Sequence, residues 1–537
     1  MCGIALAVQA GASATALWTT LVQEVACRGP DAQQACTQGG ISLYASVLGL
    51  RGETVTRQPL TSPDNTLWLA WNGQVFEADE ESWYASAEND AAILLRHIQA
   101  VAPPQRKEAL CSLLAHMDGP YAFALVDFHE RAIYFGRDPL GRRSLLYAQH
   151  EGSTYVCSVA SDASVQQHVP WAEVDCTSIW RLGMETRSDP TALSRDVRTH
   201  YTTRLTLCAP SSPIPTSILP AFAEILEESV RRRVQCTRVS SLATPGAARI
   251  AVLFSGGLDC TVLAALAAKH VPRDEPIDLI NVAFENPRAI AAAWAAAPPG
   301  ATIDEDQFPA DPYAVPDRMT AQKSLDDLQR LYPSRTWQLV RVNVPFAEYT
   351  AHTQHIETLM YPTASVMDLS IAAALYFASR GRGDVHGHMY ISPARILLSG
   401  LGADELLAGY ARHRQAWRRG GDVALTAELQ MDMDRLPTRN LGRDDRVFSS
   451  HAREARYPYL ARSVMTYLAT LPVRAKADFS EDGHGDKQLL RALAAQLGLA
   501  HASTLPKRAI QFGARSAKMD AQGARQKGHA ALHPRSS

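Results

Sequence analysis

The stretch "IAVLFSGGLDC", residues 250–260, decides the fold of the second half of this 537-residue chain. Its five leading apolar residues predict a strand buried on both faces. A glycine loop follows the strand, and an Ala- and Leu-rich helix is predicted from about Thr261. A glycine loop between a strand and a helix collects backbone N–H groups that can hold a phosphate. No G-x-x-x-x-G-K-[ST] pattern occurs, so this is not a Walker loop.

The sequence on both sides of this stretch extends the same pattern. A helix is predicted over residues 220–234, and further strands are predicted at 277–284, 337–344 and 395–398, each beside helical sequence. Strands that alternate with helices predict an α/β domain with a parallel sheet covered on both faces. Residues 285–320 are rich in Ala and Pro without a sustained period, and we expect an excursion from the sheet there.

The first half of the chain has a different pattern of apolar residues. Short alternating apolar runs are separated by Gly, Pro, Asn and Asp; they are residues 41–50, 65–76, 120–128, 131–138, 144–149 and 154–161. This pattern predicts antiparallel sheets, interrupted by one helix at residues 88–101. We therefore predict four segments: a first domain over 1–185, a linker over 186–217, a second domain over 218–515 and a disordered tail over 516–537.

Composition narrows the class of protein. Apolar residues make up 46% of the chain and the net charge is -2, which gives no reason to expect a nucleic-acid or membrane partner. The nine cysteines are scattered and form no C-x-x-C pair, so neither a disulfide framework nor a zinc site is indicated. The amino terminus lacks a basic region typical of a signal peptide. We expect a cytoplasmic protein with small-molecule partners.

The chain begins "MCGIALAV", with a cysteine directly after the initiator methionine. Removal of Met1 would leave Cys2 with a nucleophilic sulfur and a free α-amine on one residue. An α-amine has a pKa of roughly 7.7 to 8.0 and can accept the thiol proton during attack. A cysteine at this position is usually without meaning, so its interpretation depends on the sequence that follows.

An ordered series of motifs follows Cys2: "CRGPD" (27–31), "LRGETVTRQPL" (50–60), "WNGQVFE" (71–77), "ENDAAIL" (88–94), "MDGPYAFALVD" (117–127) and "RDPLGRRSLL" (137–146). The series resembles the class II glutamine amidotransferases, which are amino-terminal-nucleophile (Ntn) hydrolases. This resemblance implies a four-layer αββα sandwich, in which two antiparallel sheets lie between helices. It also implies that Cys2 is the nucleophile that releases ammonia from glutamine.

The same resemblance assigns roles around Cys2. Arg51 would hold the α-carboxylate of glutamine and Asp90 its α-ammonium group. Asn72 and the backbone N–H of Gly73 would form an oxyanion hole. The stretch Arg28, Gly29, Pro30 and Asp31 resembles a mobile loop over the bound glutamine. Taken alone, each arginine could be a surface charge, and Asn-Gly could be a hairpin turn.

The "SGGLD" segment resembles the pyrophosphate loop of N-type ATP pyrophosphatases, in which a carboxylate attacks the α-phosphorus of ATP to give an acyl-adenylate and pyrophosphate. The nucleotide-binding residues that this resemblance implies are Leu253, Ser255, Gly256, Gly257, Asp259 and Val282. Asp259 would also bind Mg²⁺. Taken alone, a glycine loop after a strand can be a simple turn.

Two later stretches are similar to asparagine synthetases. "ILLSGLGADELLAGY" (396–410) resembles their "LSGEGSDE" segment, and "GRDDRVFSSHAREARYPYL" (442–460) resembles their "DR…H…E.R.PFL" segment. The match implies that Ser399 and Gly400 contact the nucleotide and that Asp404 is the second magnesium ligand. In that family, ammonia attacks adenylated aspartate to give asparagine, with ATP and Mg²⁺ as cofactors.

The chain also departs from the asparagine synthetase pattern and resembles a side branch of the family. Leu401 stands where the family has a glutamate that handles protons, and a leucine cannot move protons. The expected pyrophosphate-binding lysine has no clean counterpart, because Ala509 falls at its position, with Lys507 and Arg508 beside it as candidates. Three interpretations stay open: an asparagine synthetase, a glutaminase or ligase with another acceptor, and a non-catalytic nucleotide-binding protein. The oligomeric state is also open, a homodimer included.

Overall fold

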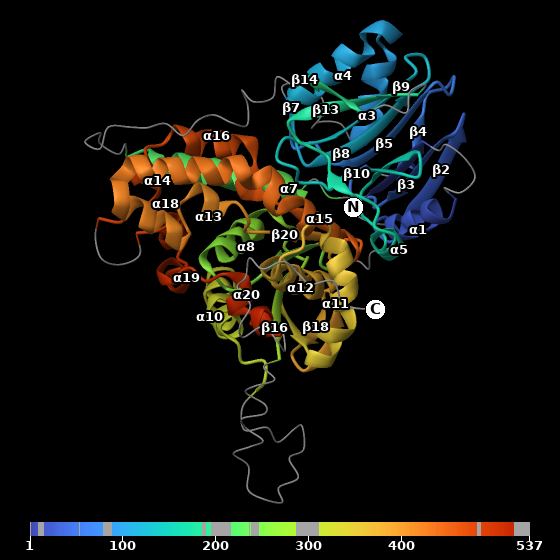
Figure 1. Cartoon of the computed structure of the whole chain (residues 1–537). Helices are drawn as coiled ribbons and strands as arrows, with labels where there is room; N and C mark the ends of the chain where they lie inside the picture. The colour runs from blue at the N-terminus through green and yellow to red at the C-terminus, as the bar shows by residue number, and fades with distance from the viewer. Residues whose placement is uncertain are drawn as a thin grey trace, which may run out of the picture.

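Figure 1 shows the structure of the protein, a computed structural model. It describes residues 2–8, 15–52, 54–78, 88–184, 189–194, 216–235, 237, 246–285, 311–480 and 485–519. The first half of the chain, blue to cyan in Figure 1, packs beside the second half, green to red. Among the residues described, no helix combines the length and the apolar character that crossing a membrane requires.

Two six-stranded antiparallel sheets form the centre of the first half. The first sheet has the order β12-β10-β11-β1-β3-β2 and the second β14-β13-β9-β8-β5-β4. The strands of the first sheet are β1 (Gly3–Val8), β2 (Ala32–Gln38), β3 (Ile41–Val47), β10 (Leu146–His150), β11 (Ser153–Cys157) and β12 (Ala172–Glu173). Those of the second are β4 (Leu60–Thr61), β5 (Leu67–Gly73), β8 (Tyr121–Asp127), β9 (Ala132–Arg137), β13 (Ser178–Gly183) and β14 (Thr191–Ser194). A separate pair is formed by β6 (Glu77–Ala78) and β7 (Met117–Asp118).

Alternation along the strands builds four layers. Ile4 and Leu6 of β1 point into the core between the two sheets, whereas Ala5 and Ala7 point out toward α1 (Thr15–Ala26). On the other side, α3 (Asp90–Gln99) and α4 (Arg106–Ala115) cover the second sheet through a separate apolar cluster. The short helix α5 (Asp162–Gln166) contacts α1. The predicted αββα sandwich is therefore confirmed.

The expectation of a single helix in this half is wrong, because α1, α4 and the short α5 are also present. In α1, several β-branched Thr and Val residues obscure the helical pattern, since these residue types favour strands. In α4, only two apolar side chains, Leu110 and Leu114, are buried, so the helix has little apolar stripe to detect. The strand β14 lies inside the segment expected to be a linker and pairs with β13.

A seven-stranded sheet forms the centre of the second half, in the order β19-β18-β17-β16-β15-β20-β21. Its strands are β15 (Ile250–Leu253), β16 (Ile277–Phe284), β17 (Trp337–Val344), β18 (Arg382–Val385), β19 (His388–Ile391), β20 (Ile396–Leu398) and β21 (Glu454–Arg456). The five strands from β17 to β21 along the order are parallel, and the β18–β19 hairpin extends one edge antiparallel. The predicted parallel sheet is confirmed. The order reverses between β15 and β20, which opens a crevice at the carboxyl ends of these strands.

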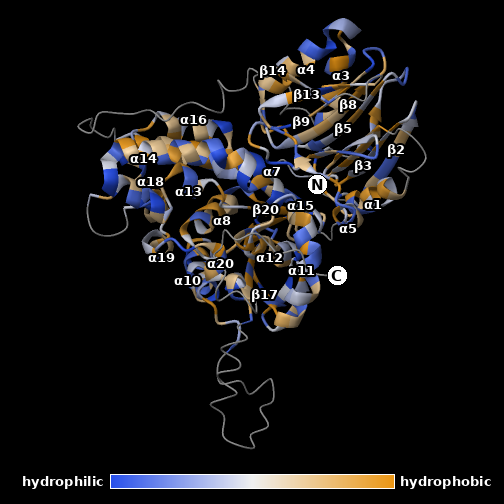
Figure 2. Ribbon diagram, viewed as in Figure 1, coloured by the Kyte–Doolittle hydropathy of each residue, from blue (hydrophilic) through white to orange (hydrophobic). Residues whose placement is uncertain are grey.

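Helices surround this sheet. They are α7 (Ile218–Gln235), α8 (Leu258–His270), α10 (Pro316–Leu331), α11 (Phe346–Met360), α12 (Val366–Arg380), α13 (Ala403–Leu406), α14 (Ala411–Arg439), α15 (Leu441–Ser449), α16 (Arg462–Thr470), α17 (Val473–Lys476), α18 (Gln488–Gln496), α19 (Ala500–Thr504) and α20 (Ile510–Gly513). Figure 2 shows apolar residues concentrated on the strands and on helices such as α8 that pack against them. Of the expected excursion at 285–320, residues 286–310 lie outside the described residues, and α10 begins within the remainder.

Buried ion pairs join the two halves. Asp445 of α15 accepts a hydrogen bond from Arg28 at 2.8 Å and one from the backbone N–H of Ser144 at 3.0 Å. Arg143 lies 3.6 Å from the same carboxylate. Arg446 reaches Glu173 at 2.8 Å. Because these contacts are fully or largely buried, they hold the two halves in one fixed arrangement.

Candidate active sites in the two halves

The first candidate site is a small pocket at the start of β1. It is lined by the five residues predicted to act on glutamine, which are Cys2, Arg51, Asn72, Gly73 and Asp90. Cys2 precedes β1, Arg51 follows β3, Asn72 and Gly73 end β5, and Asp90 begins α3. Residues that are far apart in the chain thus meet, because the starts of β1 and α3 lie beside the ends of β3 and β5.

Asn72 has the most unusual environment in this pocket. The residue is 1% exposed, yet among the residues that the structure describes, neither its amide oxygen nor its amide nitrogen has a hydrogen-bond partner. A buried polar group without a partner is costly, so such a group in a pocket is suited to a ligand. Gly73 follows directly, and a Cβ there would lie 2.5 Å from the carbonyl oxygen of Pro120. Only glycine therefore fits at the end of β5.

Arg51 and Asp90 form an ion pair in the same pocket. The carboxylate also accepts a hydrogen bond of 2.8 Å from the backbone N–H of Val75. Burial raises the pKa of Asp90 to about 6, although Arg51 opposes this effect. Adjacent charges of opposite sign match an amino acid, because its α-carboxylate and α-ammonium group share one carbon atom.

Cys2 is the nucleophilic side chain of this pocket. Burial raises the pKa of its thiol above the ordinary value. Since the thiolate is the reactive form, a base has to accept the proton as the sulfur attacks.

The expected mobile loop over glutamine does not line this pocket. Arg28 is buried, donates to Asp445 and also donates to the Cys2 carbonyl oxygen at 3.3 Å. A Cβ on Gly29 would lie 2.2 Å from the backbone nitrogen of Val47, so the loop lies tightly against β3. Arg28 therefore supports the backbone of Cys2, and both Arg28 and Asp31 form ion pairs with residues of the second half of the chain.

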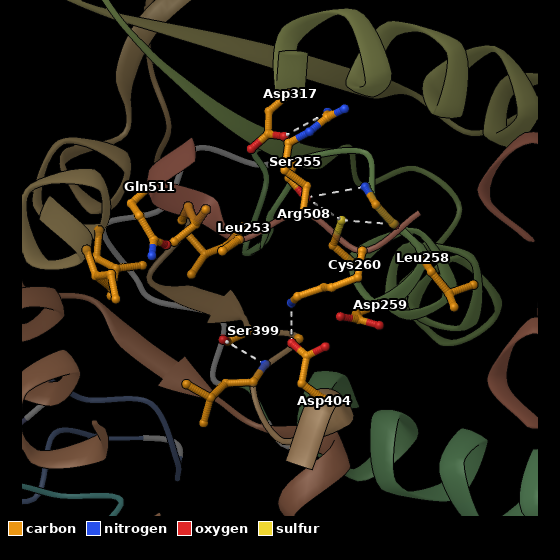
Figure 3. Close-up of a pocket in the computed structure, with 18 of the residues that line it drawn as sticks. Leu253, Ser255, Leu258, Asp259, Cys260, Asp317, Ser399, Asp404, Arg508 and Gln511 are labelled. Atoms are coloured by element: carbon orange, nitrogen blue, oxygen red, sulfur yellow. Dashed lines mark hydrogen bonds and ion pairs between the residues drawn. The ribbon is translucent and has the colours of Figure 1, made fainter. Parts of the chain in front are cut away.

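The second candidate site is a cavity of about 440 Å³ at the switch point of the parallel sheet. The predicted residues that line it are Leu253, Ser255, Gly257, Asp259, Val282, Ser399, Gly400, Asp404, Lys507 and Arg508. Figure 3 shows Asp259 and Asp404 close together, with Ser399 beside them and Arg508 near Asp317 at the opposite side. Gly257 is the N-cap of α8, so the positive end of this helix opens onto the cavity.

Gly256 is not among the lining residues. Its φ is +76°, and a Cβ would lie 2.4 Å from the backbone nitrogen of Ala321 on α10. The carbonyl oxygen of Gly256 accepts a hydrogen bond from Ser324 at 2.6 Å. The residue fastens the loop to α10, whereas the sequence suggested that it holds phosphate directly.

Lys487 is a residue of this cavity that the sequence analysis missed. Its ammonium group is 2.7 Å from carboxylate oxygens of both Asp259 and Asp404, and Lys507 pairs with Asp404 as well. Although burial opposes ionisation, the two lysines hold the pKa of Asp404 well below its ordinary value. The sequence offered no clean counterpart of a pyrophosphate-binding lysine at Ala509, and Lys487, which directly precedes α18, is a further candidate from its place in the cavity. The signal was the segment "GDKQLLRALAAQLG", a lysine directly before an amphipathic helix.

Leu401 and Arg508 complete the wall of the cavity. Leu401, Met367 and Ile371 are apolar residues among those that line the cavity. Arg508 lies 3.7 Å from Asp317, and burial raises the pKa of this aspartate to about 7.

Two neighbouring strands of the parallel sheet, β20 and β21, lead to the two pockets. Glu454 of β21 lines the first pocket, 3.1 Å from Arg143 and 2.8 Å from Arg456. The adjacent parallel strand β20 runs directly into Ser399, which lines the second. The sheet of the second half therefore contributes to both sites.

Comparison with known proteins agrees with this division. Residues 1–207 match the glutamine amidotransferase domain family, and residues 419–534 match the asparagine synthase family. Asparagine synthetase domain-containing protein 1 of Gallus gallus is 34% identical, over 92% of this chain and 93% of that protein. The human protein of the same name is 30% identical over 97% and 96%. A putative glutamine-hydrolyzing asparagine synthetase 1 of Methanocaldococcus jannaschii is 22% identical over 90% and 84%.

At this identity and coverage, the chain belongs to the family of asparagine synthetase domain-containing proteins, with a glutamine amidotransferase domain and an asparagine synthase domain.

Proposed function

We propose that the protein is a glutamine-dependent amide ligase. It releases ammonia from glutamine in the first pocket and transfers it to a carboxylate that ATP has adenylated in the second. Aspartate is the acceptor that we rank first, with asparagine, glutamate, AMP and pyrophosphate as products. The observation that carries the proposal is the buried Asn72 amide without partners beside Cys2.

The first reaction begins with attack of the Cys2 sulfur on the side-chain carbonyl carbon of glutamine. The α-amine of Cys2, freed by removal of Met1, accepts the thiol proton and passes it to the departing ammonia. Asn72 and the N–H of Gly73 donate to the oxyanion of the tetrahedral intermediate. Water then hydrolyses the thioester and releases glutamate. Arg51 and Asp90 hold the charged end of the substrate throughout.

The second reaction takes place at the switch point of the parallel sheet. An acceptor carboxylate oxygen attacks the α-phosphorus of ATP, pyrophosphate leaves, and ammonia displaces AMP from the acyl-adenylate. Ser255, Gly257 and the start of α8 are suited to the phosphates. Lys487, Lys507 and Arg508 supply positive charge for the departing pyrophosphate. Leu253, Val282, Ser399 and Gly400 would surround the remainder of the nucleotide.

Asp259 and Asp404 are the residues that would hold Mg²⁺. Their oxygens face one cavity and both lie 2.7 Å from the same ammonium nitrogen, and carboxylate oxygens are the ligands that Mg²⁺ prefers. When bound, the ion would neutralise charge on the pyrophosphate.

A second candidate function is a ligase, or a plain glutaminase, that does not act on aspartate. Leu401 favours it, because a leucine replaces the family glutamate among the lining residues and, with Met367 and Ile371, adds apolar surface to the cavity. Apolar surface suits an aliphatic acceptor better than a second carboxylate. A nucleotide-binding protein without turnover is the third interpretation.

The decisive experiment offers the full-length protein glutamine, ATP, Mg²⁺ and a set of carboxylates, and measures ammonia and pyrophosphate separately. We expect Cys2→Ala to abolish ammonia release, by about 10⁴-fold or more, while pyrophosphate formation with added ammonia persists. Cys27→Ala, which removes an exposed thiol, is the matched control and should change neither. Equal ammonia release by Cys2→Ala, or retention of Met1 in the active protein by intact mass, would contradict the proposal. ATP binding without pyrophosphate release would favour the third interpretation.

A further inference from the structure

Three metal-ligating side chains from both halves of the chain meet away from the two pockets. They are Glu24 of α1, Asp162 of α5 and His355 of α11, and one donor atom of each lies within 4.8 Å of the others. Helix α5 contacts both α1 and α11, and Figure 1 shows α1, α5 and α11 following one another along one side of the molecule. The cluster therefore sits where the first half of the chain rests on the second.

The acidic residues of this cluster differ from the other acids of the same interface. Asp31, Glu173 and Asp445 each pair with an arginine across the interface. Glu24 and Asp162, by contrast, receive no hydrogen bond or ion pair from any lysine or arginine in the part of the chain that the structure describes.

One oxygen of Asp162 is buried and has no hydrogen-bond partner within the described ranges of the chain. Two carboxylates that face one another without a cation repel, and a buried carboxylate oxygen without a partner adds a desolvation cost. An imidazole beside them completes a donor set of two oxygens and one nitrogen. The cluster thus lacks a positive charge at a place where three ligand atoms converge.

We propose that Glu24, Asp162 and His355 bind one divalent transition-metal ion, for which Zn²⁺ is the best match, and that this ion fastens the two halves together. Imidazole nitrogen with carboxylate oxygen is a ligand set that suits Zn²⁺, whereas Mg²⁺ and Ca²⁺ prefer oxygen alone. Three protein ligands leave a fourth position for water. All three residues are half-buried, so the ion can reach them from solvent.

The ring of His355 is held in place by its neighbours. It packs edge-on against Tyr376 of α12, with ring centroids 6.0 Å apart. His352, one turn earlier on α11, also packs on Tyr376 at 5.7 Å, but its Nδ1 bonds to the backbone carbonyl of Glu348 at 2.9 Å. His352 is therefore a matched control that shares the helix and the aromatic contact but lies outside the cluster.

The test uses the full-length protein, freed of metal with a chelator and then titrated with Zn²⁺ by calorimetry. We expect one Zn²⁺ per chain at this site and a rise in the thermal midpoint on binding. His355→Gln and Glu24→Gln should each weaken binding by about tenfold or more, since even the loss of a residue that only supports a ligand costs 10 to 100-fold. His352→Gln should bind as the unchanged protein does.

Circular dichroism of each variant establishes that it is folded before binding is compared. Equal Zn²⁺ affinity in His355→Gln, Glu24→Gln and the unchanged protein would overturn the proposal, as would the absence of binding. Substitution by Co²⁺ gives a further readout: a thiolate charge-transfer band would assign the ion to a cysteine and contradict this site. Equal competition by Mg²⁺ would contradict the transition-metal class.

Discussion

Lys487 forms ion pairs with two aspartates of the second pocket. Its ammonium group lies between Asp259, in the first turn of α8, and Asp404, in α13. The lysine side chain is almost fully buried. The lysine pairs with both carboxylates at one point and, with Lys507, holds the pKa of Asp404 well below its ordinary value. In the proposed reaction the same charge would stabilise the departing pyrophosphate.

We predict that Lys487→Met lowers pyrophosphate formation by at least about 100-fold, because the transition state loses a positioned charge, Asp259 loses its lysine partner and Asp404 keeps only Lys507. Ammonia release from glutamine should continue, since that pocket is separate. Lys269→Met, which removes a surface lysine paired with Glu227, serves as the control and should retain both activities. A steady-state assay of both products checks the outcome, and unchanged pyrophosphate release would refute the role.

Asp90 gives a pH prediction. Its raised pKa, about 6, means that the carboxyl group takes up a proton as the pH falls below 6. Only the ionised form attracts the α-ammonium of glutamine, so the KM for glutamine should rise by nearly tenfold between pH 7 and pH 5. Asp90→Asn should have a high KM that varies little over this range. A pH profile of glutaminase kcat/KM that stays flat in the unchanged protein would argue against this assignment.

At the scale of elements, the loop after β15 depends on its contact with α10. Gly256 and Gly246 have nearly the same backbone angle, φ +76° and +77°, but a Cβ would meet α10 backbone only at Gly256 and open space at Gly246. Alanine substitutions at these two glycines therefore separate the free-energy cost of the left-handed backbone conformation from the cost of the clash with α10.

We predict that Gly246→Ala lowers the free energy of unfolding by about 1 kcal/mol, the cost of the left-handed conformation. Gly256→Ala should cost about 1–3 kcal/mol more, because the loop has to move away from α10. Nucleotide binding should weaken in Gly256→Ala alone. Denaturant unfolding and ATP titration measure both effects, and equal losses in the two variants would rule out the clash.

The elements with strong local patterns could be predicted from the sequence. β16 and β17 begin and end at the predicted residues, because both have eight residues and are rich in apolar side chains, which alternate with polar ones in β17. The short strands β18, β19 and β21 could not, because each has only three or four residues: β18 and β21 are largely polar, and the apolar Met389 and Ile391 of β19 are exposed. Of the sites, the residues around Cys2 and most of the named residues of the nucleotide cavity were predicted by motif, whereas Lys487 was missed and Arg28 was expected over the glutamine pocket. Lys487 has only a weak local signal, and the position of Arg28 depends on a contact with Asp445, 417 positions away, which no local pattern records.

At the scale of the whole molecule, the two halves are held by charges that neither half can satisfy alone. Asp445 is fully buried with Arg28 and Arg143, and all three side chains are at most 1% exposed. Removing one member of such a group leaves the remainder uncompensated.

We predict that Asp445→Asn, which keeps the shape and removes the charge, lowers the free energy of unfolding by about 3 kcal/mol or more. Asp434→Asn on the exposed side of α14 is the matched control, and we expect a change within about 0.5 kcal/mol. Denaturant unfolding compares the two. Near-equal stability would show that the arginines find other partners, and the interface would then be held mainly by its apolar contacts.

The same pairing has a consequence for synthesis on the ribosome. Arg28 and Asp445 are 417 positions apart in the chain. At about 5–20 residues per second, roughly 20–80 s pass between the emergence of the arginine and that of its partner. During this interval the nascent first half contains Arg28, which donates to the Cys2 carbonyl oxygen in the folded protein, without the carboxylate of Asp445. The glutamine pocket therefore reaches its final form only when translation has passed α15, and the nascent chain completes this pocket late.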